Sequence, residues 1–187
     1  MTQTAPIACV GAGLVGRAWA LVFAAAGRPV RIYDQRAEVA EAARGFATEM
    51  LPARAKEDLL AGADPGEVFS RLSVASSLEG ALKGATHVQE STPEDLTIKR
   101  VVFSRLDSAA DPAATLASST SALLPSSFTE DLPGRARCLG RASDQPALSD
   151  PRRRSRAGAL DRCSSGRGDR GTPARLRHDA DRDEART

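Results

Sequence analysis

A short glycine-rich pattern near the N-terminus constrains the fold of this chain more than any other feature. Residues 11–16 read Gly-Ala-Gly-Leu-Val-Gly, with the spacing G-x-G-x-x-G. A short apolar run precedes the pattern, and an alanine-rich, helix-like run at 14–26 follows it. In that context Gly11 permits a tight turn, Gly13 leaves room for a ligand beside the backbone, and Gly16 lets the helix pack closely on the strand. The sequence therefore predicts a strand, a phosphate-binding turn and a helix.

The pattern opens an alternation of short β-rich runs and longer helix-like segments that continues to about Leu139. Such an alternation is typical of a parallel sheet covered by helices. We expect strands at Ile7–Val10, Val30–Tyr33, Leu72–Ala75, His87–Glu90, Thr115–Ala117 and Ala136–Leu139. The predicted fold is a Rossmann-type α/β domain over residues 5–139, doubly wound around a mainly parallel sheet.

Three helices can be placed from their capping and breaking residues. Leu14–Ala26 ends before Gly27, which suits a left-handed closing turn. Glu38–Leu60 is expected to bend or break near Pro52. A third helix is expected to begin with Thr92 as its cap, Pro93 at its first position and Glu94 in its first turn. Its buried face would comprise Ile98, Val101, Val102, Phe103 and Leu106.

An acidic residue after the second strand indicates which cofactor the turn would bind. Asp34 lies near the expected ~20 residues beyond the glycines, where a carboxylate accepts hydrogen bonds from the adenosine ribose hydroxyls and repels a 2′-phosphate. The pyrophosphate would rest on the helix N-terminus, on the amides of Leu14 and Val15 among others. We therefore predict NAD rather than NADP, a preference that Arg36 would weaken. The alternative is a glycine turn that binds nothing.

Four stretches carry a more specific signal. They are residues 11–20, which include Trp19; residues 88–94, Val-Gln-Glu-Ser-Thr-Pro-Glu; Lys99 with Phe103 and Leu106-Asp107; and residues 118–121, Ser-Ser-Thr-Ser. In identity and order they resemble the NAD-binding domain of L-3-hydroxyacyl-CoA dehydrogenases, especially the lambda-crystallin or L-gulonate 3-dehydrogenase branch. The resemblance spans almost the whole predicted domain.

The resemblance implies an NAD-dependent oxidoreductase that oxidises the 3-hydroxyl of an acyl-CoA, as in fatty acid metabolism, or of a small hydroxy acid such as L-gulonate. It places Glu94 and Lys99 at the NAD site, and Ser121 where cofactor and substrate meet. Taken singly, Glu94 could cap its helix, Lys99 could be a solvated charge and Ser121 a turn residue. His87 matches no functional position and is expected to be an ordinary strand residue. The resemblance also implies a homodimer, an assembly that we regard as doubtful for this chain.

The composition changes abruptly after Leu139. Residues 140–187 contain no Val, Ile, Phe, Tyr, Trp or Met, but three leucines and twelve arginines. Such a segment buries too little apolar surface to offset its ordering entropy, so we expect a disordered tail. Its arginines do not favour nucleic-acid binding, because Asp and Glu are interspersed and no aromatic residue is present for base stacking.

The resemblance also implies a catalytic histidine in an H-P-x-N-P motif just after the sixth strand, with a glutamate twelve positions later. The chain has no such motif there, so no catalytic residue is predicted. The codons of these residues can be read in a frame shifted by one base. With a permissible choice of synonymous codons, residues 140–151 then give VAHPINPPYLIP, and residues 152–164 give AVEAVPAPWTDA. The shifted frame restores the histidine, the asparagine and the glutamate in register. We therefore hypothesise a frame change near codon 139.

Charge and cysteine content limit the remaining function classes. The formal net charge is +2, and no apolar run approaches the ~20 residues that cross a bilayer, so neither nucleic acid nor a membrane is expected as a partner. Cys9, Cys138 and Cys163 lack metal-ligand spacing and are expected to be small apolar or incidental residues of a cytoplasmic protein without a metal. Two functions remain open: the NAD-binding part of a dehydrogenase, without turnover in this chain, and a non-catalytic dinucleotide-binding regulatory module.

Overall fold

A computed structural model describes residues 4–60 and 62–140 of the chain. The tail predicted from residue 140 onward lies outside the described residues, apart from Gly140.

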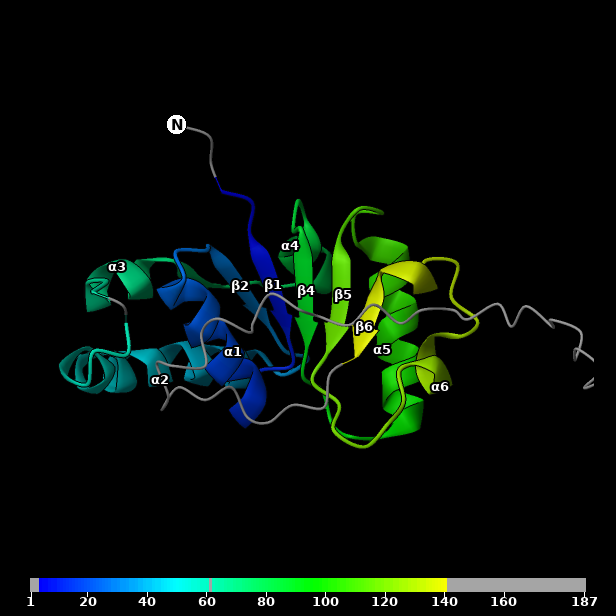
Figure 1. The fold of residues 1–187 in the computed structure, drawn as a ribbon, viewed down its shortest axis with the longest axis horizontal. Helices are drawn as coiled ribbons and strands as arrows, with labels where there is room; N and C mark the ends of the chain where they lie inside the picture. Colours follow the sequence, from blue (N-terminus) through cyan, green and yellow to red (C-terminus); the bar gives the residue numbers. More distant parts are fainter. Residues whose placement is uncertain (1–3, 61, 141–187) are drawn as a thin grey trace, which may run out of the picture.

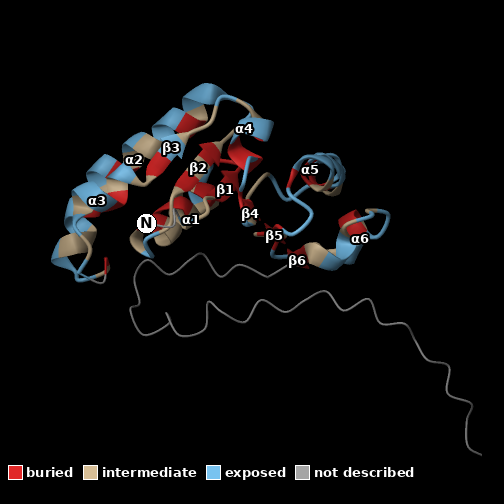
Figure 2. Cartoon of the chain, turned by 90° about the horizontal axis from the view of Figure 1, so that it is seen from above, coloured by how far each residue is buried: buried red, intermediate tan, exposed pale blue. Residues whose placement is uncertain are grey.

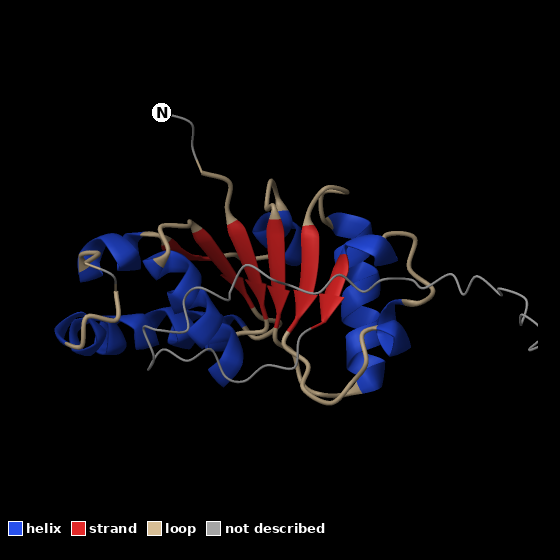
Figure 3. Ribbon diagram, in the orientation of Figure 1, coloured by secondary structure: helices blue, strands red, loops and turns tan. Residues whose placement is uncertain are grey.

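Within the described residues, six strands form one parallel sheet (Figure 1). They are β1 (Ile7–Val10), β2 (Val30–Tyr33), β3 (Leu72–Val74), β4 (His87–Glu90), β5 (Thr115–Ser118) and β6 (Cys138–Gly140). Their order is β3-β2-β1-β4-β5-β6, with every neighbouring pair parallel. The strand arrows in Figure 3 accordingly point the same way, so their carboxyl ends share one edge of the sheet. This is the doubly wound Rossmann arrangement expected from the sequence.

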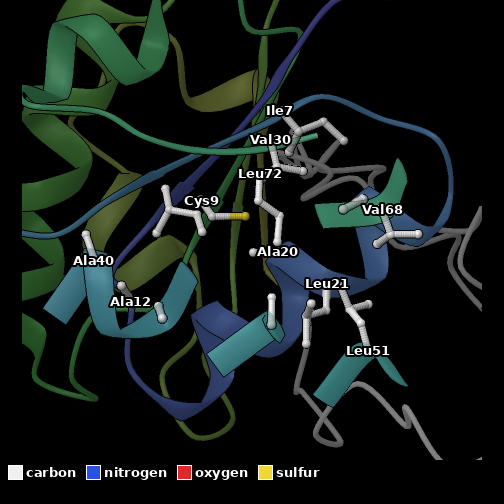
Figure 4. Packing of buried hydrophobic residues seen from close by; sticks show 14 of the residues in the cluster. Ile7, Cys9, Ala12, Ala20, Leu21, Val30, Ala40, Leu51, Val68 and Leu72 are labelled. Carbon is white, nitrogen blue, oxygen red and sulfur yellow. The ribbon is translucent and has the colours of Figure 1, made fainter. Parts of the chain in front are cut away.

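The strands lie between two hydrophobic clusters, one on each face of the sheet. Along β1, Ile7 and Cys9 belong to one cluster and Ala8 and Val10 to the other, because successive side chains of a strand point to opposite faces. Figure 4 shows the first cluster, where side chains of β1, β2 and β3 meet those of the covering helices. All four residues of β1 are buried, and Figure 2 shows the central strands as the most buried elements.

In the part of the chain that the structure describes, three helices cover each face. Over the first cluster lie α1 (Leu14–Ala25), α2 (Ala37–Lys56) and α3 (Pro65–Ser70), and over the second lie α4 (Leu78–Leu82), α5 (Leu96–Ala109) and α6 (Ser126–Thr129). A 3₁₀ turn, Arg135–Arg137, leads into β6. Within the described ranges, no helix combines the length and the apolar character needed to cross a bilayer.

Most strand predictions are confirmed to within a residue, and α1 ends one residue before the expected Ala26. Gly27 has a φ of 83°, the left-handed conformation expected of a closing residue. The expected last strand, from residue 136 to Leu139, is wrong at its start, because the 3₁₀ turn occupies residues up to Arg137 and β6 begins at Cys138.

Two helix predictions are wrong in their details. The helix was expected to bend or break near Pro52 and to reach Leu60. It does not break there, because α2 continues through Pro52, and it ends at Lys56. The expected cap of α5 at Thr92 is also wrong: α5 begins at Leu96, and the carboxylate of Asp95 accepts the hydrogen bond from the Ile98 amide that defines the cap.

The buried face of α5 differs from the predicted one in a way that bears on the site. Val102, Phe103 and Leu106 are buried as expected, but Ile98 and Val101 are 38% and 57% exposed. Lys99 takes the remaining buried position, with 1% exposure. The sequence alone did not suggest this, because a lysine is assigned to the solvent side of a helix by default.

Candidate cofactor site

A cleft of about 590 Å³ opens at the carboxyl edge of the sheet, where the strand order reverses between β1 and β4. Ligands of doubly wound sheets bind at such a point. Three segments supply most of the lining: the glycine turn with the start of α1, the end of β2 with the residues after it, and the loop after β4 with α5. The lining residues are Val10, Gly11, Gly13, Leu14, Val15, Tyr33, Asp34, Gln35, Arg36, Val39, Leu78, Ser91, Thr92, Pro93, Ile98, Val102 and Arg105.

Two of the three glycines are required by close packing within the protein. Gly11 has a φ of +89°, and a Cβ there would lie 2.7 Å from the backbone of Ser91. A Cβ on Gly16 would lie 1.8 Å from the carbonyl oxygen of Gly11. Both contacts are too short for a side chain, so these glycines hold the turn against the first turn of α1 and the loop after β4.

The middle glycine has a different environment. A Cβ on Gly13 would meet no protein atom within 4 Å, and Gly13 lines the cleft. No side chain caps the N-terminus of α1, so the amides of its first turn, including those of Leu14 and Val15, are directed out of the helix. Open space beside a glycine, together with these amides, fits a pyrophosphate bound directly against the backbone.

Asp34 is fixed in the cleft lining directly after β2, beside the glycine turn. Its Oδ2 accepts a hydrogen bond of 2.9 Å from the Ala12 amide, and its Oδ1 accepts one of 3.1 Å from the Arg36 amide. The first bond ties the end of β2 to the glycine turn. A carboxylate held by two amides keeps further lone pairs for the hydroxyls of a ribose.

The remaining walls provide apolar surface and positive charge. Val39 and Leu78 lie on elements after β2 and β3, and Ile98 and Val102 are one turn apart on α5. This apolar lining fits the adenine ring of a dinucleotide, and the exposed Arg105 follows Val102 on the cleft side of α5. The residues present therefore fit NAD.

Glu94 neither lines this cleft nor caps α5. Its Oε1 accepts hydrogen bonds from the Thr120 hydroxyl at 2.6 Å and from the amides of Ser121, Ala122 and Leu123 at 3.0, 2.9 and 3.3 Å. Partial desolvation raises the pKa of Glu94, but these hydrogen bonds outweigh it and lower the pKa to about 2. Glu94 thus shapes the loop after β5, and it is in direct contact with Ser121, which the resemblance placed where cofactor and substrate meet.

Lys99 is buried behind the cleft lining. Its Nζ lies 2.9 and 3.0 Å from the two carboxylate oxygens of Glu90, a residue at the carboxyl end of β4 with 0% exposure. It also donates to the Thr92 carbonyl at 3.3 Å. Glu90 was not singled out in the sequence. The signal that could have identified it is the spacing of Lys99 with Val102, Phe103 and Leu106, which places the lysine on the buried face of α5 and requires a partner carboxylate.

The structure therefore divides the predicted site residues into two sets. Gly11, Gly13, Leu14, Val15 and Asp34 line the cleft, with Gly16 packed behind them. The others, Glu94, Lys99 and Ser121, lie in the adjoining loops and the buried layer between β4, β5 and α5, and their predicted contact with the cofactor stays a prediction.

His87 and the described cysteines lie apart from this edge. His87 is the first residue of β4 and packs edge-on against Phe23, with ring centroids 5.5 Å apart; burial lowers its pKa. Cys9 and Cys138 are buried, as expected for small apolar residues, and burial raises the pKa of Cys9 to about 12. In the part of the chain that the structure describes, no three His, Cys, Asp or Glu side chains gather in a metal-binding group.

Comparisons with known proteins agree with this geometry. Residues 6–142 match the family model of the NAD-binding domain of 3-hydroxyacyl-CoA dehydrogenase. The lambda-crystallin homolog of Bos taurus is 40% identical over 134 residues, which are 71% of this chain and 42% of that protein. The L-carnitine dehydrogenase/betainyl-CoA thioesterase of a Rhizobium species is 41% identical over 125 residues, 67% of this chain and 24% of that protein.

Solved structures of related enzymes superpose on this chain. The 3-hydroxybutyryl-CoA dehydrogenase of Escherichia coli K12 superposes with a TM-score of 0.67 at 26% identity, covering 73% of this chain and 29% of that one. A diketoreductase superposes with a TM-score of 0.71 at 26% identity, covering 80% and 53%. This chain thus spans about two fifths of its curated lambda-crystallin relatives. It belongs to the 3-hydroxyacyl-CoA dehydrogenase family, of which it contains the NAD-binding domain.

Proposed function

We propose that this chain binds NAD in the cleft at the carboxyl edge of the sheet. The observation that carries the proposal is the opening of the first turn of α1 into the cleft beside Gly13, with Asp34 fixed next to the glycine turn by the Ala12 amide. The pyrophosphate would accept hydrogen bonds from the amides of Leu14 and Val15, and the adenosine ribose would donate to Asp34. Adenine would lie against the apolar wall formed by Val39, Leu78, Ile98 and Val102.

In the intact protein, this domain would serve the oxidation of a 3-hydroxyl group by hydride transfer to NAD. A small hydroxy acid or an acyl-CoA is the proposed substrate, in line with relatives named for L-carnitine and 3-hydroxybutyryl-CoA. The bound NAD would accept the hydride. The loop that carries Ser121, fixed by Glu94, would border the place where cofactor and substrate meet.

For the chain as written we propose cofactor binding without turnover. Oxidation of a hydroxyl needs a base to take its proton, and histidine is the side chain that titrates near neutral pH. Within the residues that the structure describes, the histidine is His87. It lies at the amino end of β4, whereas the cleft is at the carboxyl end, and its ring packs against Phe23. It cannot reach a substrate at the cleft. We further propose that the protein works in the cytosol, where a buried thiol such as that of Cys9 stays reduced.

Calorimetric titration of the full chain with NAD and with NADP tests the proposal. The wild-type chain should bind NAD more tightly than NADP, because Asp34 repels a 2′-phosphate. Asp34→Ala should lower NAD affinity about tenfold, as expected when a charge-assisted hydrogen bond is lost, and should reduce the preference for NAD. Glu79→Gln, on the exposed side of α4, serves as the control and should bind both cofactors like the wild type. Absence of NAD binding by the wild-type chain would contradict the proposal.

A further inference from the structure

The buried Glu90–Lys99 pair is the feature of this domain that the cofactor cleft itself does not explain. Both side chains are almost fully buried, with exposures of 0% and 1%, and neither lines the cleft. Removing two charges from water is costly, and apolar residues of similar size often stabilise a core at least as well. Fold stability alone is therefore a weak reason for a charged pair at this position.

Lys99 is turned away from the cleft. Its Nζ faces the two carboxylate oxygens of Glu90 and the Thr92 carbonyl. Its side chain is 1% exposed and does not line the cleft. In this arrangement the lysine acts on the cleft through the groups that it holds.

Glu90 connects the pair to the two loops that border the site. Its Oε1 accepts hydrogen bonds from the amide and the hydroxyl of Thr92, the first at 2.6 Å, and its Oε2 accepts one of 2.6 Å from the Ser118 hydroxyl. The amide, hydroxyl and carbonyl of Thr92 are thus all bound to the pair. The Ser118 hydroxyl in turn accepts a hydrogen bond from the Thr120 amide, next to Ser121.

The loop that Glu90 and Lys99 hold lies directly against the phosphate-binding turn. A Cβ on Gly11 would lie 2.7 Å from the Ser91 backbone and 2.9 Å from the Thr92 amide nitrogen, and a Cβ on Gly16 would lie 3.4 Å from Ser91 Cβ. Any shift of this loop therefore displaces the glycine turn or opens a gap beside it. An unbroken series of contacts runs from Glu90 through Thr92 to Gly11.

We infer that Glu90 and Lys99 are positioning residues of the cofactor site, which fix the glycine turn and the Ser121 loop from behind without touching NAD. The inference rests on the proposed binding of NAD in the cleft. It assigns to Glu90 a part in cofactor binding and makes the contribution of Lys99 indirect.

The test separates cofactor affinity from stability. Glu90→Gln and Lys99→Met each break the pair. Asp107→Asn breaks a second, half-buried pair, formed by Asp107 and Arg137 at 2.8 Å between α5 and the turn before β6. Asp107 does not line the cleft, so it provides a matched control. NAD affinity is measured by calorimetry and stability by thermal unfolding, at a temperature where every variant is folded.

All three variants should unfold more easily, but only Glu90→Gln and Lys99→Met should lose NAD affinity, by about tenfold or more. The double variant should bind about as weakly as the weaker single variant, because both residues act through the same loop. The loss of NAD affinity in Lys99→Met should stay the same as ionic strength rises, because salt screens a buried charge poorly. Ser118→Ala, a milder change that keeps the pair, should lower affinity by a smaller factor.

Several results would overturn the inference. If the loss of NAD affinity in Lys99→Met becomes smaller as the salt concentration rises, the ammonium of Lys99 contacts the cofactor phosphates directly. If Glu90→Gln binds NAD with wild-type affinity, the pair only stabilises the fold. The same follows if Asp107→Asn loses as much NAD affinity as Glu90→Gln. If Glu90→Gln does not fold, unchanged affinity in Ser118→Ala contradicts the inference. Absence of binding by the wild-type chain would instead overturn the proposed function.

Discussion

Three carboxylates at the carboxyl edge of the sheet have different surroundings and therefore different roles. Asp34 lines the cleft and keeps lone pairs for a ligand. Glu94 fixes the loop after β5 through a single oxygen. Glu90 is buried and connects β4, β5 and α5. The residue type is nearly the same at the three positions, so burial and hydrogen-bond donors decide what each can do.

The low pKa of Glu94 predicts an acid-dependent loss of stability. Its folded-state pKa of about 2 lies below the ordinary 4.5, so the ionised carboxylate stabilises the folded state above pH 4.5, and this contribution is lost as the pH falls from 4.5 toward 2. Between pH 5 and pH 3, the free energy of unfolding measured with urea should therefore fall more for the wild type than for Glu94→Gln.

Glu79→Gln provides the comparison for Glu94, because it removes an exposed glutamate in the first turn of α4. Its acid dependence should match that of the wild type. An identical acid dependence in Glu94→Gln and the wild type would contradict the role assigned to the four hydrogen bonds on Glu94.

Residues whose role follows from the backbone were predictable, and those whose role depends on tertiary contacts were not. The glycines and Asp34 follow from a local strand, turn and helix, and the structure places them at the cleft or packed against it. The sequence could not show that Glu94 accepts hydrogen bonds from a loop 26 to 29 positions later, nor that Glu90 pairs with Lys99. Both depend on how β4, β5 and α5 pack.

Among the elements, long apolar patterns were predicted well, and helix ends and short helices were not. The strands were placed closely because short β-rich runs alternate with helix-like segments, and α1 because its apolar residues continue to Gly27. The start of α5 was misplaced because Thr92 and Glu94 resemble capping residues, but their side chains bind Glu90 and the loop after β5 instead. The short helices α3, α4 and α6 carry too few apolar positions to show a helical period.

The continuation of α2 through Pro52 leads to a prediction about stability. Proline inside a helix removes one hydrogen bond and disturbs the preceding turn, at a cost of roughly 3 kcal/mol in an exposed helix interior. Pro52 is exposed, and its neighbour Leu51 is buried in the first cluster. Pro52→Ala should therefore raise the free energy of unfolding by about 1–3 kcal/mol, as measured by urea denaturation.

Pro65→Ala is the control for the effect at Pro52. Pro65 occupies the first position of α3 behind the Asp64 cap, where proline is well tolerated. This change should alter stability by less than about 0.5 kcal/mol. Equal effects of the two substitutions would mean that α2 is not strained by Pro52.

At the scale of the whole molecule, the doubly wound sheet places the cleft where the strand order reverses, and the family match covers the same residues. The alternation of strands and helices was enough to predict this architecture. The frame change near codon 139 and the disordered tail stay predictions, because they concern residues outside those that the structure describes. Resequencing of the gene from the codon for Ser118 would test the frame change.

The central claim is that NAD binds against the backbone at Gly13, and Gly13→Ala tests it most directly. A Cβ there meets no protein atom, so the variant should fold with wild-type stability, whereas Gly16→Ala, whose Cβ would lie 1.8 Å from Gly11, should be clearly destabilised. Calorimetric titration should show that the wild-type chain binds NAD and that Gly13→Ala binds it at least about tenfold more weakly, a loss of about 1.4 kcal/mol. Wild-type affinity in a folded Gly13→Ala variant would contradict the account.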